Sequence, residues 1–282
     1  MWYNICIRKE IKQEVEMFNF HSHTVYCGHG LNTPEEMIKS AVDMGMSTIG
    51  ISEHYGKNEK GEWFWHSIKD PKGYYQDFLK AKEKYKDKIE ILLGFEMDVQ
   101  EYDYEKTYKE ILTYNPDYVL GSVHAYKDMF FSGGFDFYKT KTKEYLDNII
   151  KEYLSYCVKI INLGYVNCLD HFDSYKKFYH LEDEEELYPY YKEIAKALRD
   201  NNVAIELNTH YFFEGIYEPD PNFYMLNLAK EYDIPVMVSS DAHSAEDLNH
   251  KFTDAFEILK KIGIKTTCRF KNRQVIKEPF NP

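Results

Sequence analysis

The stretch MFNFHSHTVYCGHG, residues 17–30, joins a short apolar run to three histidines. Its first four residues, Met17–Phe20, form an apolar run rich in β-formers, which predicts a short buried strand. His21 and His23 follow at once, and because side chains alternate along a strand, both imidazoles fall on one face. His29 comes six residues later. The stretch therefore predicts a strand whose carboxyl end carries metal-binding side chains.

The same unit, a short apolar strand followed by a helix, recurs along the rest of the chain. The further predicted strands are Ser47–Ile51, Ile89–Phe95, Tyr118–Leu120, Tyr165–Leu169, Val203–Leu207 and Val236–Ser239. The predicted helices are Pro34–Met44, Tyr74–Tyr85, Asp103–Tyr114, Lys143–Asn162, Glu185–Asn201, Pro221–Tyr232 and Ala245–Ile262. Alternation of strands and helices predicts an α/β fold with a parallel sheet, and seven units favour a barrel related to the (β/α)8 form. An open doubly wound sheet is the alternative, although no GxGxxG follows the first strand.

Composition limits the classes of protein that this chain can belong to. The chain has 282 residues, 44% of them hydrophobic, which is enough for one large α/β domain, expected over 17–282 after a lead-in of 1–16. No run approaches the roughly 20 apolar residues of a membrane span, so we expect no membrane partner. The formal net charge of −12 argues against a nucleic-acid partner. Five cysteines without a CxxC, and no signal-peptide pattern at the start, indicate the cytoplasm.

Histidines concentrate where the predicted strands end. The chain has 11 histidines, and seven of them lie at or just past a predicted strand end: His21, His23, His29, His54, His124, His171 and His243. Carboxylates stand among them at Glu96 and Asp241. Neutral imidazoles with carboxylates suit zinc, iron or manganese, and so many donors imply two or three ions. For Cys27, a small buried thiol is favoured over a ligand.

The ordered motifs HSHT, CGHG, SEH, GFE, GSVH, LDH and SDAH resemble the PHP (polymerase and histidinol phosphatase) superfamily. The resemblance runs from about Met17 to about Arg273. It implies a distorted (β/α)7 barrel and a metal-dependent hydrolase. Within the superfamily, the motifs look most like those of the histidinol-phosphate phosphatases.

Carried over motif by motif, the resemblance implies three metal positions. The first ion would be held by His21, His23, Glu96 and Asp241, with Glu96 bridging to a second ion. That second ion would be held by His124 and His171 as well, and a third by His29, His54 and His243. All nine positions carry residues that can bind a divalent ion.

Other polar residues near the strand ends leave alternatives open. Asp170 either donates a proton to the leaving alcohol or orients a neighbouring ligand such as His171. Glu53 either orients His54 or contacts substrate. Of Glu206 and Asn208, one is expected to face the site, and Glu206 could instead point at a helix. In the loop after this strand, which has no arginine, His210 is either a phosphate contact or a plain loop histidine.

The expected activity is hydrolysis of L-histidinol phosphate, a small phosphorylated substrate, by a phosphomonoesterase of histidine biosynthesis. Glu96, Asp241 and Asp170 are the catalytic candidates. The alternative is a PHP phosphoesterase acting on another small phosphate ester or on nucleic acid. A binding module with structural ions fits less well, since structural zinc sites are closed and four-coordinate. An amidohydrolase also starts from HxH, but Glu96 matches the PHP pattern better. The oligomeric state is not predicted.

Overall fold

The computed structural model describes residues 16–58, 60–99, 104–127, 129–131, 134–181, 183–210, 212 and 219–280, with only the backbone described for Gly134, Phe135 and Phe137. Apart from Glu16, the predicted lead-in lies outside the described residues. The extent of the domain, 17–282, stays a prediction.

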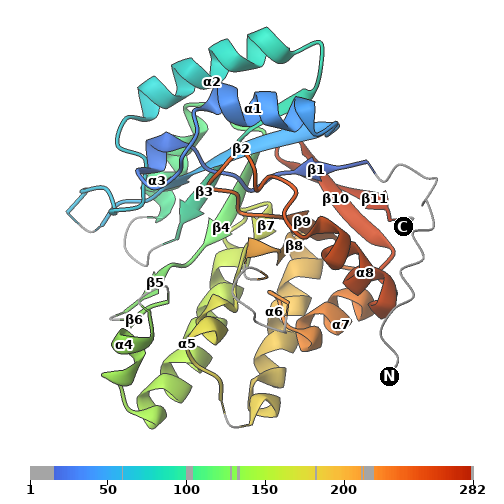
Figure 1. Ribbon diagram of the computed structural model, residues 1–282. Helices are drawn as coiled ribbons and strands as arrows, with labels where there is room; N and C mark the ends of the chain where they lie inside the picture. Colours follow the sequence, from blue (N-terminus) through green and yellow to red (C-terminus); the bar gives the residue numbers. More distant parts are fainter. Residues whose placement is uncertain are drawn as a thin grey trace, which may run out of the picture.

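Seven parallel strands form a distorted barrel, as the sequence predicts (Figure 1). Their bounds are β1 Phe18–Asn19, β2 Thr48–Tyr55, β3 Glu90–Asp98, β4 Tyr118–Ser122, β7 Cys168–Leu169, β8 Ala204–Asn208 and β9 Val236–Ser239. Each pairs in parallel with the next in this order. Just past β1 and β9, a parallel bridge joins Ser22 to Ala242, with the His23 amide 2.8 Å from the Ala242 carbonyl. This bridge closes the barrel at the carboxyl ends of its strands.

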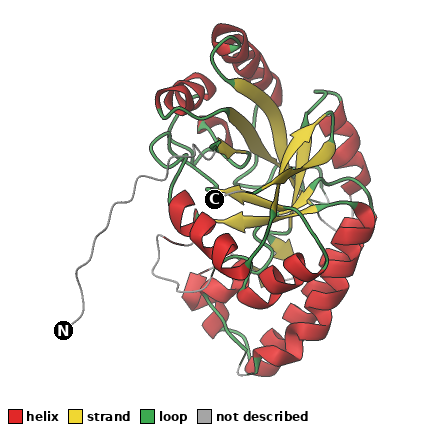
Figure 2. Ribbon diagram, turned by 90° about the vertical axis from the view of Figure 1, so that its right-hand side faces the viewer, coloured by secondary structure: helices red, strands yellow, loops and turns green. Residues whose placement is uncertain are grey.

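Helices surround the strands on the outside (Figure 2). Their bounds are α1 Pro34–Asp43, α2 Pro71–Tyr85, α3 Tyr104–Leu112, α4 Gly134–Lys139, α5 Lys143–Asn162, α6 Tyr188–Asn201, α7 Phe223–Glu231 and α8 Phe252–Ile262. Single 3-10 turns lie at Val25–Cys27, Ser174–Lys177 and Glu184–Leu187. The predicted start of α1 is confirmed, because Thr33 forms a capping box with Glu36 and Pro34 opens the first turn.

Large side chains fill the barrel interior at the end where the strands begin, away from the histidines. Tyr118 is fully buried there, its hydroxyl donating to the Phe20 carbonyl at 2.5 Å. Gly50 and Gly94 leave room for its ring, since a Cβ added at either would lie 2.2 Å from a Tyr118 atom. Phe270 stacks on Tyr118 with ring centroids 4.9 Å apart. A separate, larger apolar core packs the helices against the outside of the strands.

Phe270 belongs to a hairpin that the sequence analysis missed. Strands β10 (Thr266–Lys271) and β11 (Gln274–Pro279) pair antiparallel, and β10 joins β9 through Thr267 and Val236. A second small hairpin, β5 (Ala125–Tyr126) with β6 (Met129–Phe130), follows β4.

The prediction of a helix from Ala245 was wrong over its first seven residues, because α8 begins at Phe252. The preceding segment is held in a non-helical path by side chains of the barrel. Asn19 Nδ2 donates to the Leu248 carbonyl at 2.9 Å, and Thr209 Oγ1 donates to the His250 carbonyl at 2.7 Å. Among the helices that the structure describes, none has both the length and the apolar run that a membrane span requires.

Candidate metal centre

The predicted donors converge at the carboxyl ends of the barrel strands. His54 and Glu96 lie within β2 and β3, and the other seven donors lie in segments that follow a strand. Because parallel strands end at the same rim of a barrel, donors far apart in sequence meet there. Asp241, just past β9, adopts a left-handed backbone with φ of 47°, a conformation that turns the chain sharply and that aspartate tolerates better than most residues.

Glu96 stands at the middle of the cluster and is almost fully buried. Its Oε2 lies 3.3 Å from His21 Nε2, 3.4 Å from His23 Nε2 and 2.6 Å from His54 Nδ1. Its Oε1 lies 3.0 Å from His171 Nε2.

The same oxygen, Glu96 Oε1, also lies 3.3 Å from His124 Nε2. One carboxylate thus faces five imidazoles that come from four different strand ends. Such an arrangement suits a carboxylate that bridges two ions.

Two further groups of donors flank Glu96. Asp241 Oδ1 lies 3.1 Å from His23 Nε2 and 3.5 Å from His21 Nε2. His243 Nε2 lies 2.8 Å from His29 Nε2, so both imidazoles direct a nitrogen at the same point. His29, His54 and His243 together, and His21, His23 and Asp241 together, place their donor atoms within 4.8 Å of one another.

The buried donor atoms fit divalent ions because they lack ordinary partners. Within the described part of the chain, no hydrogen bond is made by His21 Nε2, either nitrogen of His23, His54 Nδ1, Glu96 Oε2 or Asp241 Oδ1. Buried polar atoms without partners are costly, and here they point at one another rather than at apolar surface. Cations between them would give most of these atoms a partner, as in sites built from imidazole and carboxylate.

The protonation states of His29, His54, His243 and the two carboxylates suit metal ligands, whereas nearby carboxylates, against the effect of burial, raise the pKa of three other donors, His21, His124 and His171. Burial, followed by the charge of the neighbouring histidine, lowers the pKa of His29 to about 4. Burial likewise lowers the pKa of His243 to about 4, and it lowers that of His54 well below its usual value. Against the effect of burial, nearby imidazoles hold the pKa of Glu96 and of Asp241 well below the usual carboxyl range. Neutral imidazoles and ionised carboxylates are the forms that bind metal.

Glu206, which the sequence analysis left open, faces the site and not a helix. Its Oε1 lies 2.6 Å from His21 Nδ1 and accepts from the Ser239 hydroxyl at 2.5 Å. Its Oε2 accepts from the His171 amide at 2.8 Å and from Asn208 Nδ2 at 3.2 Å. The bond to His21 directs the other nitrogen, Nε2, at Glu96 and Asp241, as carboxylates do for metal-binding histidines.

Asp98 supports His124 in the same way. Its carboxylate lies 2.8 Å from His124 Nδ1 and 2.6 Å from His66 Nε2. His66 does not lie at a predicted strand end. The fold of its loop brings it next to His54 and His124. A sequence sign was present in the two-residue spacing of Glu96 and Asp98, which places both carboxylates on one face of β3.

The remaining polar candidates take different positions. Glu53 accepts from the amide of Thr24 at 2.6 Å and from its hydroxyl, so it holds the segment after His23 and makes no contact that orients His54. Burial raises the pKa of Glu53 to about 8. Asn208 Oδ1 accepts from the His210 amide at 2.8 Å, and the His210 ring lies 6.0 Å from the ring of His243.

Asp170 is buried beside the cluster, and its donor atom groups with those of His21, Glu96 and His171. Its Oδ1 lies 3.9 Å from His171 Nδ1, too far for a hydrogen bond, and neither of its oxygens has a partner within the described residues. Burial and the nearby carboxylates raise its pKa to about 8. These contacts do not support the expectation that Asp170 orients His171.

Cys27 behaves as a buried thiol. It donates to the Thr24 carbonyl at 3.1 Å and accepts from the Gly30 amide at 3.2 Å, and burial raises its pKa to about 12.

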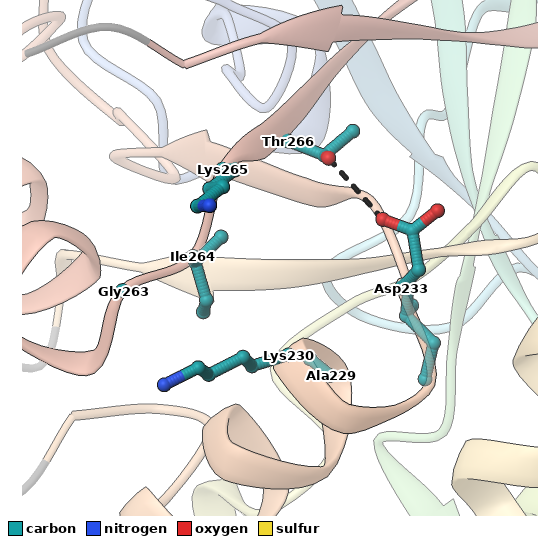
Figure 3. A pocket seen from close by; sticks show the side chains of 8 residues that line it. Ala229, Lys230, Asp233, Gly263, Ile264, Lys265 and Thr266 are labelled. Atoms are coloured by element: carbon teal, nitrogen blue, oxygen red, sulfur yellow. Dashed lines mark hydrogen bonds between the residues drawn. The ribbon is translucent and has the colours of Figure 1, made fainter.

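A surface pocket lies at the opposite end of the barrel, where β9 and β10 begin. It is lined by Ala229, Lys230, Asp233, Ile234 and residues 263–266. Figure 3 shows the side chains of Asp233 and Thr266 pointing toward one another, with Thr266 Oγ1 donating to Asp233 Oδ1 at 3.3 Å. Lys230, at its edge, donates to the Ile262 carbonyl at 2.7 Å. None of the nine predicted donors lines this pocket.

Comparison with known proteins identifies the family to which this chain is similar. A family model described as the PHP domain matches residues 19–210. The chain is 25% identical over 259 residues to a probable histidinol-phosphatase of Deinococcus radiodurans, covering 90% of this chain and 96% of the relative. It is 26% identical over 281 residues to a histidinol-phosphatase of Lactococcus lactis, covering 93% and 98%. A crystal structure of histidinol phosphate phosphatase from Lactococcus lactis, complexed with zinc, L-histidinol and phosphate, superposes with a TM-score of 0.77 at 25% identity, covering 93% of this chain and 99% of that one.

Proposed function

The chain belongs to the PHP domain family, and we propose that it is a metal-dependent phosphatase whose substrate is L-histidinol phosphate. The products would be L-histidinol and inorganic phosphate. The observation that carries the proposal is the Glu96 carboxylate, whose two oxygens lie 2.6–3.4 Å from nitrogens of five histidines. The likeness to histidinol-phosphatases over nine tenths of the chain supports the choice of substrate.

The grouping of the donor atoms supports an assignment of the ligands to three ions, and this assignment is part of the proposal. His21, His23, Glu96 and Asp241 would hold one ion; Glu96, His124 and His171 a second; His29, His54 and His243 a third. Zinc, manganese and iron all suit this mixture of imidazole and carboxylate. When bound, such ions lower the pKa of water and offset the charge of a phosphate.

The residues of the chain would divide the remaining work. Glu96 and Asp241 stay ionised and balance the positive charge of the centre. Asp170, whose buried carboxyl lies beside Glu96 and His171 without a hydrogen-bond partner among the described residues, would donate a proton to the leaving alcohol oxygen. Glu206 and Asp98 hold His21 and His124 in position.

Two alternatives remain distinct from this proposal. Another small phosphate ester would use the same centre, and the substrate panel below separates it from L-histidinol phosphate. A nucleic-acid substrate is disfavoured by the formal net charge of −12, because binding to a phosphate backbone rests on clustered lysine and arginine. A cytoplasmic location also stays a prediction.

The test is phosphate release by purified protein loaded with manganese, zinc or iron. We expect L-histidinol phosphate to be hydrolysed far faster than a panel of sugar and nucleotide phosphates, and chelation to abolish the activity. His124→Ala and Asp241→Ala should lose turnover while the barrel stays folded. His180→Ala is the matched control, because His180 is exposed and its side chain contacts Glu184. Equal, low rates across the panel would refute the choice of substrate, and full activity of His124→Ala would refute the metal assignment.

A further inference from the structure

Trp65 exposes its indole beside the metal centre. Its side chain is 65% exposed, although tryptophan is highly buried on average. The neighbouring Trp63 shows the ordinary behaviour, since its ring packs 5.0 Å from Tyr55 and 4.3 Å beneath Lys57 Nζ. Trp65 therefore does not contribute to the core, and its exposure calls for another explanation.

The indole lies at the outer edge of the donor cluster. Its ring centroid is 5.6 Å from that of His29 and 5.2 Å from that of His66. His29 in turn directs Nε2 at His243 Nε2, 2.8 Å away. Phe130, from the β5–β6 hairpin, approaches the indole from another loop at 6.4 Å. Two aromatic rings from separate segments thus flank the approach to the most exposed donors.

The loop that carries Trp65 is anchored on both sides of it. The Phe64 amide donates to the Gly56 carbonyl at 3.2 Å, and the Ile68 amide donates to the His54 carbonyl at 3.0 Å. His66 is fixed to Asp98 at 2.6 Å. The indole is therefore held out toward solvent by a buried framework, and such preorganisation favours binding of a partner.

We propose that the indole of Trp65 is the surface on which the organic half of the substrate stacks when its phosphate lies at the metal centre. The inference rests on the proposed function, for which the organic half is an imidazole on a short chain that also carries an ammonium group. An indole face binds a flat aromatic ring by stacking and a cation by its quadrupole. The ligand class is a phosphate monoester whose alcohol bears an aromatic or cationic group close to the ester.

No described arginine is placed to bind this half of the substrate. Arg199 pairs with Asp200 at the end of α6, and Arg269 pairs with Glu278 in the terminal hairpin. Arg273 lies over the ring of Tyr108, 5.3 Å from its centroid, beside the start of the strands. Recognition through an aromatic face is consistent with these positions.

The first experiment compares kcat/KM for esters with and without a ring. The substrates are L-histidinol phosphate, phenyl phosphate and glycerol 3-phosphate, and the variants are Trp65→Ala and Trp65→Phe. We expect Trp65→Ala to lose roughly 3- to 30-fold on both ring-bearing esters, mainly through KM, and to change less than twofold on glycerol 3-phosphate. Trp65→Phe should keep most of the preference for a ring. Phe223→Ala, which removes an exposed aromatic side chain of α7, is the matched control.

The outcomes separate the two proposals. An equal loss on all three esters, or no loss on any, would overturn the role of Trp65. A selective loss on phenyl phosphate, in an enzyme that does not prefer L-histidinol phosphate, would refute the proposed substrate and leave the role of Trp65 intact.

A binding measurement tests the same contact without turnover. L-Histidinol is titrated into metal-loaded protein containing inorganic phosphate, and indole fluorescence is followed. Quenching should be present in the wild type and in Trp63→Phe and absent in Trp65→Phe. Quenching that persists in Trp65→Phe would contradict the proposal.

Discussion

Glu206→Gln is expected to weaken metal binding without removing any metal ligand. The Glu206 carboxylate is buried and lies 2.6 Å from His21 Nδ1, while it also accepts from the His171 amide at 2.8 Å and from the Ser239 hydroxyl at 2.5 Å. The glutamine amide has the same shape, but it has no charge, and one of its two ends can only donate. That end would face at least one group that now donates to Glu206, so the orientation of His21 is no longer enforced.

The magnitude follows from the role of such partners. Removing a hydrogen-bonded partner of a metal-binding histidine lowers metal affinity by roughly 10- to 100-fold, or about 1.4–2.7 kcal/mol. The wild-type bond to His21 is short and joins fully buried groups, so we expect a loss toward the upper end of that range.

Competition with a chelator of known affinity, followed by elemental analysis, measures this loss directly. Glu186→Gln is the control, since Glu186 is exposed and pairs with Lys151. Circular dichroism of the metal-free variant verifies that the barrel is folded. Metal affinity within twofold of the wild type, in a folded Glu206→Gln protein, would refute the positioning role.

Three further perturbations follow from the same contacts. Asp98→Asn weakens the hold on His124, now 2.8 Å from the carboxylate, and should lower metal affinity by about tenfold in the same chelator assay; unchanged affinity would contradict this. Gly94→Ala places a Cβ 2.2 Å from the ring of Tyr118 and should reduce the free energy of unfolding in urea by about 1–3 kcal/mol, whereas a neutral effect would show that the barrel interior is loosely packed. Burial raises the pKa of Asp220 well above its usual value. The unfolded state therefore releases this proton at lower pH than the folded state, and the contribution of Asp220 to the free energy of unfolding falls as pH rises above about 4. Asp220→Asn should reduce that fall in metal-free protein, as measured by urea unfolding at several pH values. An unaltered pH dependence would contradict the raised pKa of Asp220.

The barrel and its donors could be predicted because two regular patterns coincide. Apolar runs with intervening helical periodicity reveal the strands, and parallel strands bring their carboxyl ends together whatever the loop lengths. A histidine at the end of a run, such as His124 or His171, can therefore be assigned to the rim without knowledge of its neighbours. The predicted strands and the observed ones accordingly agree in order, and the donors meet as expected.

The terminal hairpin was missed because its turn is chemically unusual. Asn272 and Arg273 both have positive φ, 49° and 59°, in a two-residue turn where Asn-Gly is the usual pair. A sign of β10 was present in the alternation that places Cys268 and Phe270 on one face, and both are buried in the barrel interior.

Supporting residues could not be assigned from the sequence, because their partners are distant along the chain. Glu206 lies 185 positions from His21, and a strand residue can face inward or outward. His66 lies in a loop with no periodicity, and only the folded structure reveals its bond to Asp98.

Anomalous diffraction from crystals of metal-loaded protein would locate the ions around Glu96. We expect peaks next to Glu96, one toward His21 and Asp241 and another toward His171, and a further peak between His29 and His243. Elemental analysis of the same protein should give two or three ions per chain. Absence of any peak within bonding distance of Glu96, in protein that hydrolyses phosphate esters, would refute the assignment of Glu96 as a metal ligand.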